Sequence, residues 1–540
     1  MHSILEAMWR ADPVEATFMG IHQYDHLLSQ CDPASRALRL QEMRGQLEQL
    51  QRFPQEVLNP EESLDRRILM DYLETTVYTT ERLNPHARLA SMYANEPSYG
   101  AYILQMREFA PLAVRAESLL GRLRMVPGYL EQGTANLKEG ESIPRAWTET
   151  TIEEARSCIL FFQEEVPRFA EGVPALKADI AQASVGAANA FKAFLRFLRE
   201  ELLPRSDGDF AVGKEVFDFL LARAHGLPYR TEDLLRIGNE IVEATLRELN
   251  AVAQQADPRA RDWTDALKIV KQDYPGDDQV LSTYAEQMRA ARDFVIQRDL
   301  VTIPEGEDLR VVETPVFQRP TTPYAAYIKP APFEKEQTGV FWVTPIDKDK
   351  PPEDQEAQRQ DHNIHGIPVT ALHEGYPGHH LQFVRANKVA SDVRKHLGTS
   401  VFWEGWALYC EEMMYGEGFY RDPRSRLCQL RDQLWRACRV LIDVKLHTGQ
   451  MTFDEAADML VNVAKLERPN AIAEVRRYVQ TPTQPMSYAI GKLEIMNLRR
   501  DYQGALGERF DLKAFHDKLL SYGSIPVGLV RERMLAEPAG

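Results

Sequence analysis

The sequence predicts a mainly α-helical protein that carries one small β-sheet. Amphipathic segments separated by proline-containing breaks fill residues 1 to about 300. Short runs of β-branched and aromatic residues follow between positions 299 and 344. Helical periodicity then resumes near Ile367 and continues to the end of the chain. We therefore divide the chain into a helical region, 1–298, and a second region, 299–540, which we expect to form one integrated unit.

Composition narrows the possible partners. The chain has 540 residues, of which 44% are hydrophobic, and a formal net charge of −16. This acidic balance argues against nucleic acid or an anionic membrane surface as a partner. No apolar run approaches the roughly 18 residues of a membrane span, and the N-terminus does not resemble a signal peptide. The five cysteines are scattered, so we expect a cytoplasmic protein, either a monomer or a homodimer.

The helical region contains one clear helix start. Thr231 is a good N-cap, and Glu232 and Asp233 follow it in the first turn, where acidic side chains are favourable. Leu234 and Ile237 then begin an apolar stripe at helical spacing. A capping box at positions 452–455 predicts a similar start near the C-terminal end.

Three short segments read as strands, namely 299–303, 309–314 and 339–344, each bounded by proline or glycine. The proline-rich passage 315–332 cannot be helical and is expected to be an ordered loop. The charged stretch 347–360 is expected to be an exposed connector. The sheet should therefore lie immediately before the motif described next.

The stretch 371–382 carries the strongest functional signal. It places three histidines and one glutamate within eight positions, His373 to His380. In the His-Glu-x-x-His motif of zinc hydrolases, histidines at i and i+4 hold the metal and the glutamate is the general base. Here position i+4 is Pro377, which would bend a helix. On an ideal helix His380 returns to the face of His373. The candidate ligands are thus His373 with His380 or, alternatively, His379, and Glu374 is the candidate base.

A catalytic zinc site needs a third protein ligand. Glu404 lies between Trp403 and Trp406 in an apolar stretch, where a carboxylate is costly unless a cation binds it. We therefore predict Glu404 as the third ligand. Glu411 and Glu412, farther along the same predicted helix, are expected to face solvent.

The same segments carry a resemblance to a known family. Residues 371–382 and 404–409, together with 16–20, 443–447 and 488–491, resemble the bacterial family called domain of unknown function 885 (DUF885). The similarity spans nearly the whole chain.

The motif is also distantly similar to helical zinc peptidases of the angiotensin-converting enzyme, thimet oligopeptidase and Taq carboxypeptidase types. This likeness implies a zincin-like fold with a deep central cleft and one Zn²⁺ per chain. The 23 residues between His380 and Glu404 match the interval of the converting-enzyme type, which favours His380 as ligand. By the same resemblance Tyr488 would donate to the oxyanion, and the strand carrying Gly339 and Phe341 would contact substrate.

These residues together predict a zinc-dependent hydrolase. We favour a metallopeptidase, or a carboxypeptidase-like enzyme, that cleaves short peptides with Glu374 as general base on zinc-bound water. A zinc-dependent hydrolase of small-molecule amides or esters, and a non-catalytic helical binding protein with a decayed site, stay open as alternatives. The expected partner is a short peptide or a small amide. His447, and Tyr324 and Tyr327 in the proline-rich loop, are further candidates for substrate contact.

Overall fold

The computed structural model describes residues 1–315, 318–319, 322 and 324–536. Its contacts divide the chain into two compact units. The first comprises Met1–Phe210, Pro315–Pro320 and Ala331–Glu336, and the second comprises Ala211–Thr314, Thr321–Pro330 and Gln337–Gly540. The domain boundary that we expected at residue 299 lies inside the second unit. The division of the chain into domains at that residue stays a prediction.

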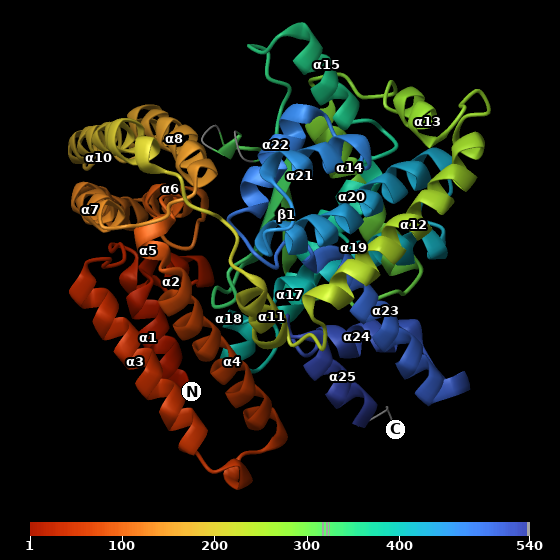
Figure 1. Cartoon of the computed structure of the whole chain (residues 1–540), viewed down its shortest axis with the longest axis horizontal. Coiled ribbons are helices and arrows are strands. Elements are labelled where there is room, and N and C mark those ends of the chain that lie inside the picture. The colour runs from red at the N-terminus through yellow and green to blue at the C-terminus, as the bar shows by residue number, and fades with distance from the viewer. Residues whose placement is uncertain (316–317, 320–321, 323, 537–540) are drawn as a thin grey trace. The chain divides into compact units, whose positions relative to one another are not determined.

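The first unit is helical throughout its described part (red to yellow in Figure 1). Its core is rich in phenylalanine and leucine, including Phe162, Phe191 and Leu119, none of which is exposed. Its α-helices are α1 (His2–Ala11), α2 (Pro13–Met19), α3 (Pro33–Arg52), α4 (Pro60–Leu83), α5 (Pro85–Arg88), α6 (Ser91–Met106), α7 (Leu112–Lys138), α8 (Arg145–Leu160), α9 (Val166–Ala170) and α10 (Lys177–Phe197).

A buried arginine forms hydrogen bonds that connect four segments of this unit. Arg122 of α7 is 1% exposed. Its guanidinium donates to the carbonyl oxygens of Leu27 (3.0 Å), Gly100 (2.6 Å) and Pro13 (3.1 Å), and to Thr17 Oγ1 (2.6 Å). Burial lowers the pKa of Arg122 to about 10, so the group still carries its charge at neutral pH. A buried charge is tolerated when hydrogen bonds satisfy it, and these bonds do so.

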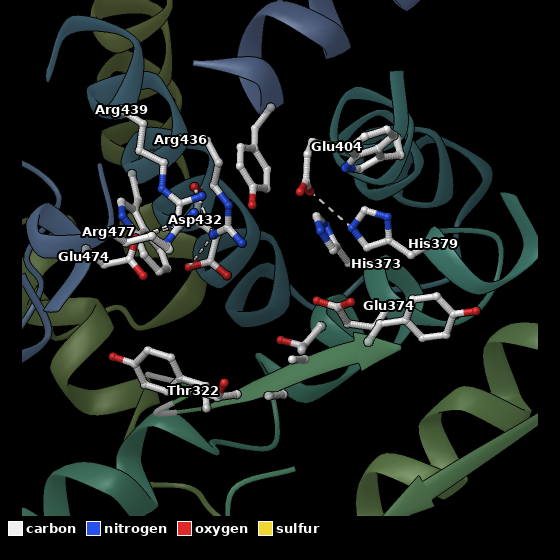
Figure 2. Close-up of a pocket in the computed structure, with 18 of the residues that line it drawn as sticks. Thr322, His373, Glu374, His379, Glu404, Asp432, Arg436, Arg439, Glu474 and Arg477 are labelled. Atoms are coloured by element: carbon white, nitrogen blue, oxygen red, sulfur yellow. Dashed lines mark hydrogen bonds and ion pairs between the residues drawn. The ribbon is translucent and has the colours of Figure 1, made fainter. Parts of the chain in front are cut away.

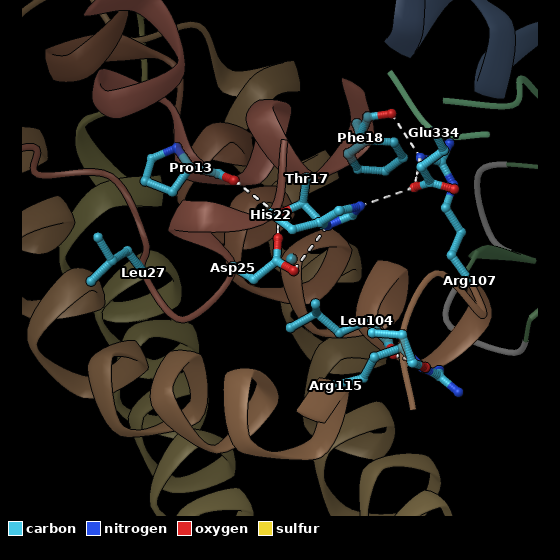
Figure 3. Close-up of polar contacts among 12 residues, drawn as sticks. Pro13, Thr17, Phe18, His22, Asp25, Leu27, Leu104, Arg107, Arg115 and Glu334 are labelled. Carbon is cyan, nitrogen blue, oxygen red and sulfur yellow. Dashed lines mark hydrogen bonds and ion pairs between the residues drawn. The ribbon is translucent and has the colours of Figure 1, made fainter. Parts of the chain in front are cut away.

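A histidine beside that arginine is held by two carboxylates, as Figure 3 shows. His22 Nδ1 lies 3.0 Å from Asp25, and Nε2 lies 3.5 Å from Glu334. The ring stacks on Phe109 at 3.7 Å. Burial alone would lower the pKa of His22, but the bonds and charges of Asp25 and Glu334 outweigh it and raise the pKa to about 9. His22 is therefore charged in the folded protein at neutral pH.

The second unit combines helices with the small sheet (yellow-green to blue in Figure 1). Within the described residues, no helix combines the length and apolar character that crossing a membrane requires. Its α-helices are α11 (Lys214–Arg223), α12 (Thr231–Ala256), α13 (Trp263–Val270), α14 (Val280–Gln297), α15 (Pro352–Asp361), α16 (Ile367–Glu374), α17 (His379–Ala386), α18 (Asp392–His396), α19 (Ser400–Glu417), α20 (Pro423–His447), α21 (Phe453–Asn462), α22 (Arg468–Tyr478), α23 (Ser487–Leu506), α24 (Leu512–Leu520) and α25 (Val527–Ala536).

The sheet has three strands, β1 (Glu307–Glu313), β2 (Ala325–Ile328) and β3 (Gln337–Val343), in the order β1-β3-β2. β1 pairs with β3 in parallel, with Val311 opposite Phe341, and β2 pairs antiparallel, with Tyr327 opposite Phe341. Phe341 and Val343 pack with Ile367 and Ala371 of α16 in one hydrophobic cluster. The predicted mainly helical fold with one small sheet is confirmed, and the sheet packs against α16, the helix that carries His373.

Three local predictions about this region are wrong. The segment 299–303 forms no strand: Asp299 has a positive φ of 51°, and the Thr302 backbone N–H donates to the carboxylate of Asp517 instead of to a neighbouring strand. Part of the stretch 347–360 is helical, because Pro352 occupies the first turn of α15, a position that suits proline. The predicted loop contains β2, and positions 316, 317, 320, 321 and 323 of it lie outside the described residues.

The predicted helix starts agree more closely with the structure. Thr452 and Glu455 form the expected capping box of α21. α12 begins at Thr231 itself, one residue earlier than an N-cap at that position implies, because Arg230 occupies the N-cap. Its predicted apolar stripe is buried, with Leu234 0% and Ile237 6% exposed.

Two glycines let α19 and α23 approach closely. A Cβ atom added at Gly405 would lie 2.4 Å from the backbone of Gly491, and one added at Gly491 would lie 2.0 Å from the Val401 carbonyl oxygen. Only residues without a side chain fit such a crossing. Since Glu404 and Tyr488 lie near these glycines in sequence, the crossing brings the two side chains to one site.

Candidate metal centre

The histidine-rich motif is broken into two helices. α16 ends at Glu374, and α17 begins at His379. Two hydrogen bonds hold the second half of the loop between them: Gly378 N–H donates to the Leu372 carbonyl (3.0 Å), and the Trp406 indole donates to the Pro377 carbonyl (2.8 Å). A Cβ atom at Gly378 would lie 1.8 Å from the His373 carbonyl oxygen. The glycine therefore allows the tight turn that places the start of α17 against the end of α16.

His373, His379 and Glu404 converge in this arrangement. One potential ligand atom from each residue lies within 4.8 Å of those of the other two. The two imidazole rings are 4.9 Å apart and meet edge to face, and His379 Nε2 lies 3.2 Å from a Glu404 carboxylate oxygen. Figure 2 shows the three side chains turned toward one another. The group is a candidate metal site.

Glu404 and His379 each shift the pKa of the other toward the charged form. Burial raises the pKa of Glu404, but the hydrogen bond and charge of His379 outweigh that effect and lower it below its usual range. Burial likewise lowers the pKa of His379, but Glu404 raises it overall. Among the described residues, the partner of Glu404 at ion-pair distance is this histidine and not an arginine. A cation held between these groups would be in a favourable field.

Glu411 orients His373 from behind. Its carboxylate accepts a hydrogen bond of 2.7 Å from His373 Nδ1, and the side chain is 1% exposed. Metal-binding histidines commonly donate their second N–H to a carboxylate, which fixes the ring and leaves the other nitrogen free. The expectation that Glu411 faces solvent is therefore wrong. The signal was present in the sequence, because Glu411 follows Glu404 by seven residues, two helical turns on the same face.

His380, the first choice of the sequence argument, is not in the converging group. Its Nε2 lies 2.7 Å from Glu307 of β1, and its Nδ1 lies 3.0 Å from the Tyr327 hydroxyl. The sequence argument placed His380, at i+7, on the face of His373 and relied on a bulge at positions 376–378 of one helix to bring the two residues together. Because the helix stops at Glu374 and restarts at His379, that spacing does not apply. The geometry selects His379, the alternative that the sequence left open.

The two predicted catalytic residues lie beside the group. Glu374, the last residue of α16, lines the same cavity, and Figure 2 shows its carboxylate beside His373. Tyr488 also lines the cavity, and Gln484 Nε2 lies 3.4 Å from its hydroxyl and 3.5 Å from a Glu404 oxygen. Burial and the charge of Glu404 raise the pKa of Tyr488. The phenol therefore keeps its proton and can donate a hydrogen bond.

The cavity has a volume of about 580 Å³, within the range of pockets for small ligands. The edge strand β2 forms one wall through Ala325, Ala326 and Tyr327, and Tyr324 lies just before it. The strand beside the cavity is thus β2, whereas β3, the predicted edge strand, lies in the middle of the sheet.

Three predicted substrate contacts lie away from the cavity lining. Phe341 is 0% exposed in the cluster behind the sheet. A Cβ atom at Gly339 would lie 2.5 Å from His380 Nδ1, so this glycine allows close packing of β3 on α17. His447 is 0% exposed, and its Nε2 donates to the Tyr478 carbonyl at 3.0 Å. All three have packing roles in the structure.

Opposite the metal group, the cavity is lined by charged residues that sequence reasoning missed (Figure 2). α20 and α22 supply four arginines and two acids: Arg431, Asp432, Arg436, Arg439, Glu474 and Arg477. The available signal was the spacing of the arginines on α20, since Arg431, Arg436 and Arg439 fall on one side of a helix most of whose residues are buried.

One family model and two solved structures match the chain over nearly its full length. The model of a bacterial family described as "protein of unknown function (DUF885)" matches residues 13–534. A solved structure from Shewanella oneidensis, described as a "putative lipoprotein of unknown function", is 25% identical with a TM-score of 0.80, over 99% of this chain and 98% of that one. Another from Colwellia psychrerythraea, described as a "putative lipoprotein", is 17% identical with a TM-score of 0.83, over 98% and 97%.

Two further comparisons add no function. A "putative oligoendopeptidase F" from Bacillus anthracis is 11% identical with a TM-score of 0.30, over 91% of this chain and 92% of that one, which does not show a shared fold. No curated protein matches the chain.

Proposed function

The chain belongs to the DUF885 family of bacterial proteins of unknown function, and we propose that it is a zinc-dependent hydrolase that cleaves short peptides. One observation carries the proposal: His373, His379 and Glu404 bring their ligand atoms within 4.8 Å of one another, with Glu374 lining the same cavity. Two imidazoles, one carboxylate and an adjacent free glutamate are the parts that a zinc hydrolase requires.

The residues present fit a zinc ion. His373 would bind through Nε2, because its Nδ1 donates to Glu411. His379 would bind through Nε2, the nitrogen that lies 3.2 Å from the Glu404 carboxylate. Two imidazole nitrogens and one carboxylate oxygen form a donor set that suits zinc and leaves a fourth position open. Zinc, when bound, supplies a Lewis acid that polarises the scissile carbonyl and lowers the pKa of water.

The chain's own groups would move the protons. Glu374 would accept a proton from the attacking water and then deliver it to the leaving nitrogen of the amide. Tyr488, which keeps its proton because burial raises its pKa, would donate a hydrogen bond to the oxygen on which negative charge develops. Removing one such donor commonly reduces kcat by ~10²–10³-fold, and we expect that loss for Tyr488→Phe.

The substrate would be a short extended peptide. A cavity of about 580 Å³ accommodates a few residues and not a folded protein. β2 pairs with β3 along one edge, and its other side belongs to the cavity wall. An extended peptide could add to this edge through main-chain hydrogen bonds, which would align its amide groups with the metal site.

The test is hydrolysis of a peptide library by zinc-loaded protein, followed by mass spectrometry. We expect cleavage that a chelator abolishes and zinc restores. Glu374→Gln should reduce turnover by roughly 10²–10⁴-fold while zinc content stays unchanged. Glu417→Gln, which alters a glutamate paired with Arg298 outside the cavity lining, is the matched control and should keep full activity. Full activity in Glu374→Gln would refute its role as general base.

A panel of non-peptide amides and esters, assayed beside the peptides, addresses the alternative substrate class. Cleavage of that panel with no cleavage of peptides would replace the peptidase proposal by a small-molecule hydrolase. Absence of zinc binding together with absence of turnover would favour the non-catalytic binding protein.

Cellular location is proposed separately. All five cysteines are free and buried, which agrees with a reducing cytoplasm, and we propose that compartment. The two solved relatives are described as lipoproteins, which favours the cell envelope for those proteins. Cell fractionation should recover this protein with the cytoplasmic fraction, and recovery with the envelope would overturn the proposal.

A further inference from the structure

The cavity wall opposite the metal group has more positive than negative charge. Glu474 is shared by two arginines, because both Arg439 and Arg477 lie 2.9 Å from it. Asp432 is likewise shared, by Arg431 at 2.6 Å and Arg436 at 3.6 Å. Four guanidinium groups are therefore paired with two carboxylates. Asp361, which also lines the cavity, is paired with Lys271 at 2.6 Å. A surplus of buried positive charge is costly unless an anion compensates it.

Arg439 has an unused donor in this wall. The side chain is 4% exposed, and its Nε and NH2 atoms donate to the Tyr478 hydroxyl (2.6 Å) and to Glu474 (2.9 Å). Its NH1 atom is buried without a hydrogen-bond partner in the described structure. Arg436 has an unpaired Nε atom, while its NH1 atom makes a long bond of 3.3 Å to the Asp432 carbonyl and lies 3.6 Å from the Asp432 carboxylate. Both arginines line the cavity.

Both arginines lie close to Tyr488, which lines the same cavity as Glu404. The Arg439 guanidinium stands over the Tyr488 ring at 4.6 Å, and that of Arg436 stands 6.0 Å from it. Figure 2 shows the arginines on one side of the cavity and His373, His379 and Glu404 on the other. A substrate whose scissile bond lies at the metal group would therefore extend toward the arginines.

We propose that Arg436 and Arg439 form a subsite for a carboxylate of the substrate, so that the enzyme prefers short peptides with a free C-terminal carboxylate. The proposal rests on the proposed function and names its substrate class. A guanidinium group matches a carboxylate in shape as well as charge, because it offers parallel N–H donors to the two oxygens. The tightly packed acids Asp432 and Glu474 hold the arginines in place and leave the outward donors free.

Matched peptide sets test the subsite directly. One set consists of N-acetylated tripeptides with a free C-terminal carboxylate, and the other consists of the same tripeptides as C-terminal amides. We expect kcat/KM for the acids to exceed that for the amides by roughly 10–100-fold, the contribution of one or two charged hydrogen bonds. In Arg436→Met this ratio should fall toward one, and Arg436→Lys should recover part of it. Arg298→Met, outside the cavity lining, should keep the wild-type ratio.

A binding measurement separates the subsite from the chemistry. Succinate and its diamide are added to zinc-loaded and to chelator-treated protein, and the thermal midpoint is measured. Succinate should raise the midpoint in both forms and succinamide in neither, and Arg436→Met should lose the succinate effect in chelator-treated protein. Arg439→Met, if it folds, should lose it as well.

The outcomes distinguish the two proposals. Equal cleavage of acids and amides, with the ratio unchanged in Arg436→Met, would overturn the subsite and leave the peptidase intact. No cleavage of either set, together with arginine-dependent stabilisation by succinate, would overturn the peptidase and support the anion site. Stabilisation by succinate that persists in Arg436→Met and is lost on removing zinc would assign anion binding to the metal and overturn the subsite.

Discussion

Each of the two units buries a cluster of charged side chains, and the two clusters differ in one physical respect. Around Arg122 in the first unit, the guanidinium donates to three carbonyl oxygens and one hydroxyl at 2.6–3.1 Å. Around Arg439 in the second unit, a buried donor has no partner and the residue lines a cavity of about 580 Å³. Each guanidinium nitrogen of Arg122 has a partner, whereas the NH1 atom of Arg439 has none among the described residues.

Buried charged groups that stabilise the fold can be distinguished from those of a binding site by whether their hydrogen-bond donors all have partners. A satisfied cluster stabilises the fold, because each donor finds an acceptor that would otherwise be unpaired. A cluster with unused donors costs stability, and such costs are typical of binding sites. The variants described below measure that difference, beginning with the largest expected effect.

Arg122→Met should strongly destabilise the protein. The change leaves the carbonyl oxygens of Leu27, Gly100 and Pro13 without their donor in a buried place, and each unpaired group costs about 1–3 kcal/mol. We expect a loss of at least about 3 kcal/mol, measured by urea denaturation. Zinc content of the folded fraction should be unchanged.

Arg436→Met is the matched variant in the other cluster. Its removal leaves Arg431 as the partner of Asp432 and reduces the surplus of positive charge. We expect the free energy of unfolding to change by less than about 1 kcal/mol, as for substitutions that break no satisfied contact. If Arg436→Met were as destabilising as Arg122→Met, the distinction between the two clusters would be wrong.

Glu411→Gln should weaken metal binding without removing it. The carboxylate holds His373 Nδ1 at 2.7 Å, and an amide can still accept that bond but without the negative charge. Changes to such supporting groups commonly cost 10–100-fold in metal affinity, and we expect a loss in that range in competition with a fluorescent chelator. An unchanged affinity would show that Glu411 does not act on the metal site.

The first unit should show a pH dependence that His22→Gln removes. The pKa of His22 is raised to about 9 from an ordinary value near 6.5, so the folded state holds its proton more tightly than the unfolded state. Stability from this group is complete below about pH 6.5 and is lost as pH rises through 9. The ring is 31% exposed, so we expect only about 1 kcal/mol. Denaturation curves at pH 6 and pH 9.5 for both proteins would measure it.

The sequence identified residues that the structure brings to one cavity, but it did not give their geometry. His373, Glu374 and Glu404 were chosen because histidine beside glutamate, and a carboxylate between tryptophans, suggest a metal site, and Tyr488 was chosen from the resemblance to helical zinc peptidases. The choice between His379 and His380 depended on whether one helix or two spans the motif. That is decided by tertiary contacts, such as the Trp406 bond to Pro377, which spacing alone does not reveal.

Prediction of the fold from the sequence has the same limit, because local patterns do not reveal tertiary contacts. Local signals were sufficient for the capping box at Thr452 and for the strands β1 and β3, whose β-branched and aromatic runs are distinctive. They were not sufficient for β2, a short strand in a proline-rich passage, whose pairing with β3 is made across the connection 329–336. The arginines of α20 were equally hidden, because a charged residue on a helix is usually a surface residue and only the packed structure shows these ones lining a cavity.

The central claim is that His373, His379 and Glu404 hold one zinc ion, and metal content after zinc loading and desalting tests it most directly. Mass spectrometry of the metal should find about one zinc per chain in the wild type and in His380→Gln, and little in His379→Gln at an equal folded fraction by circular dichroism. Zinc retained in His379→Gln and lost in His380→Gln would contradict the account, as would a wild-type protein that binds no metal.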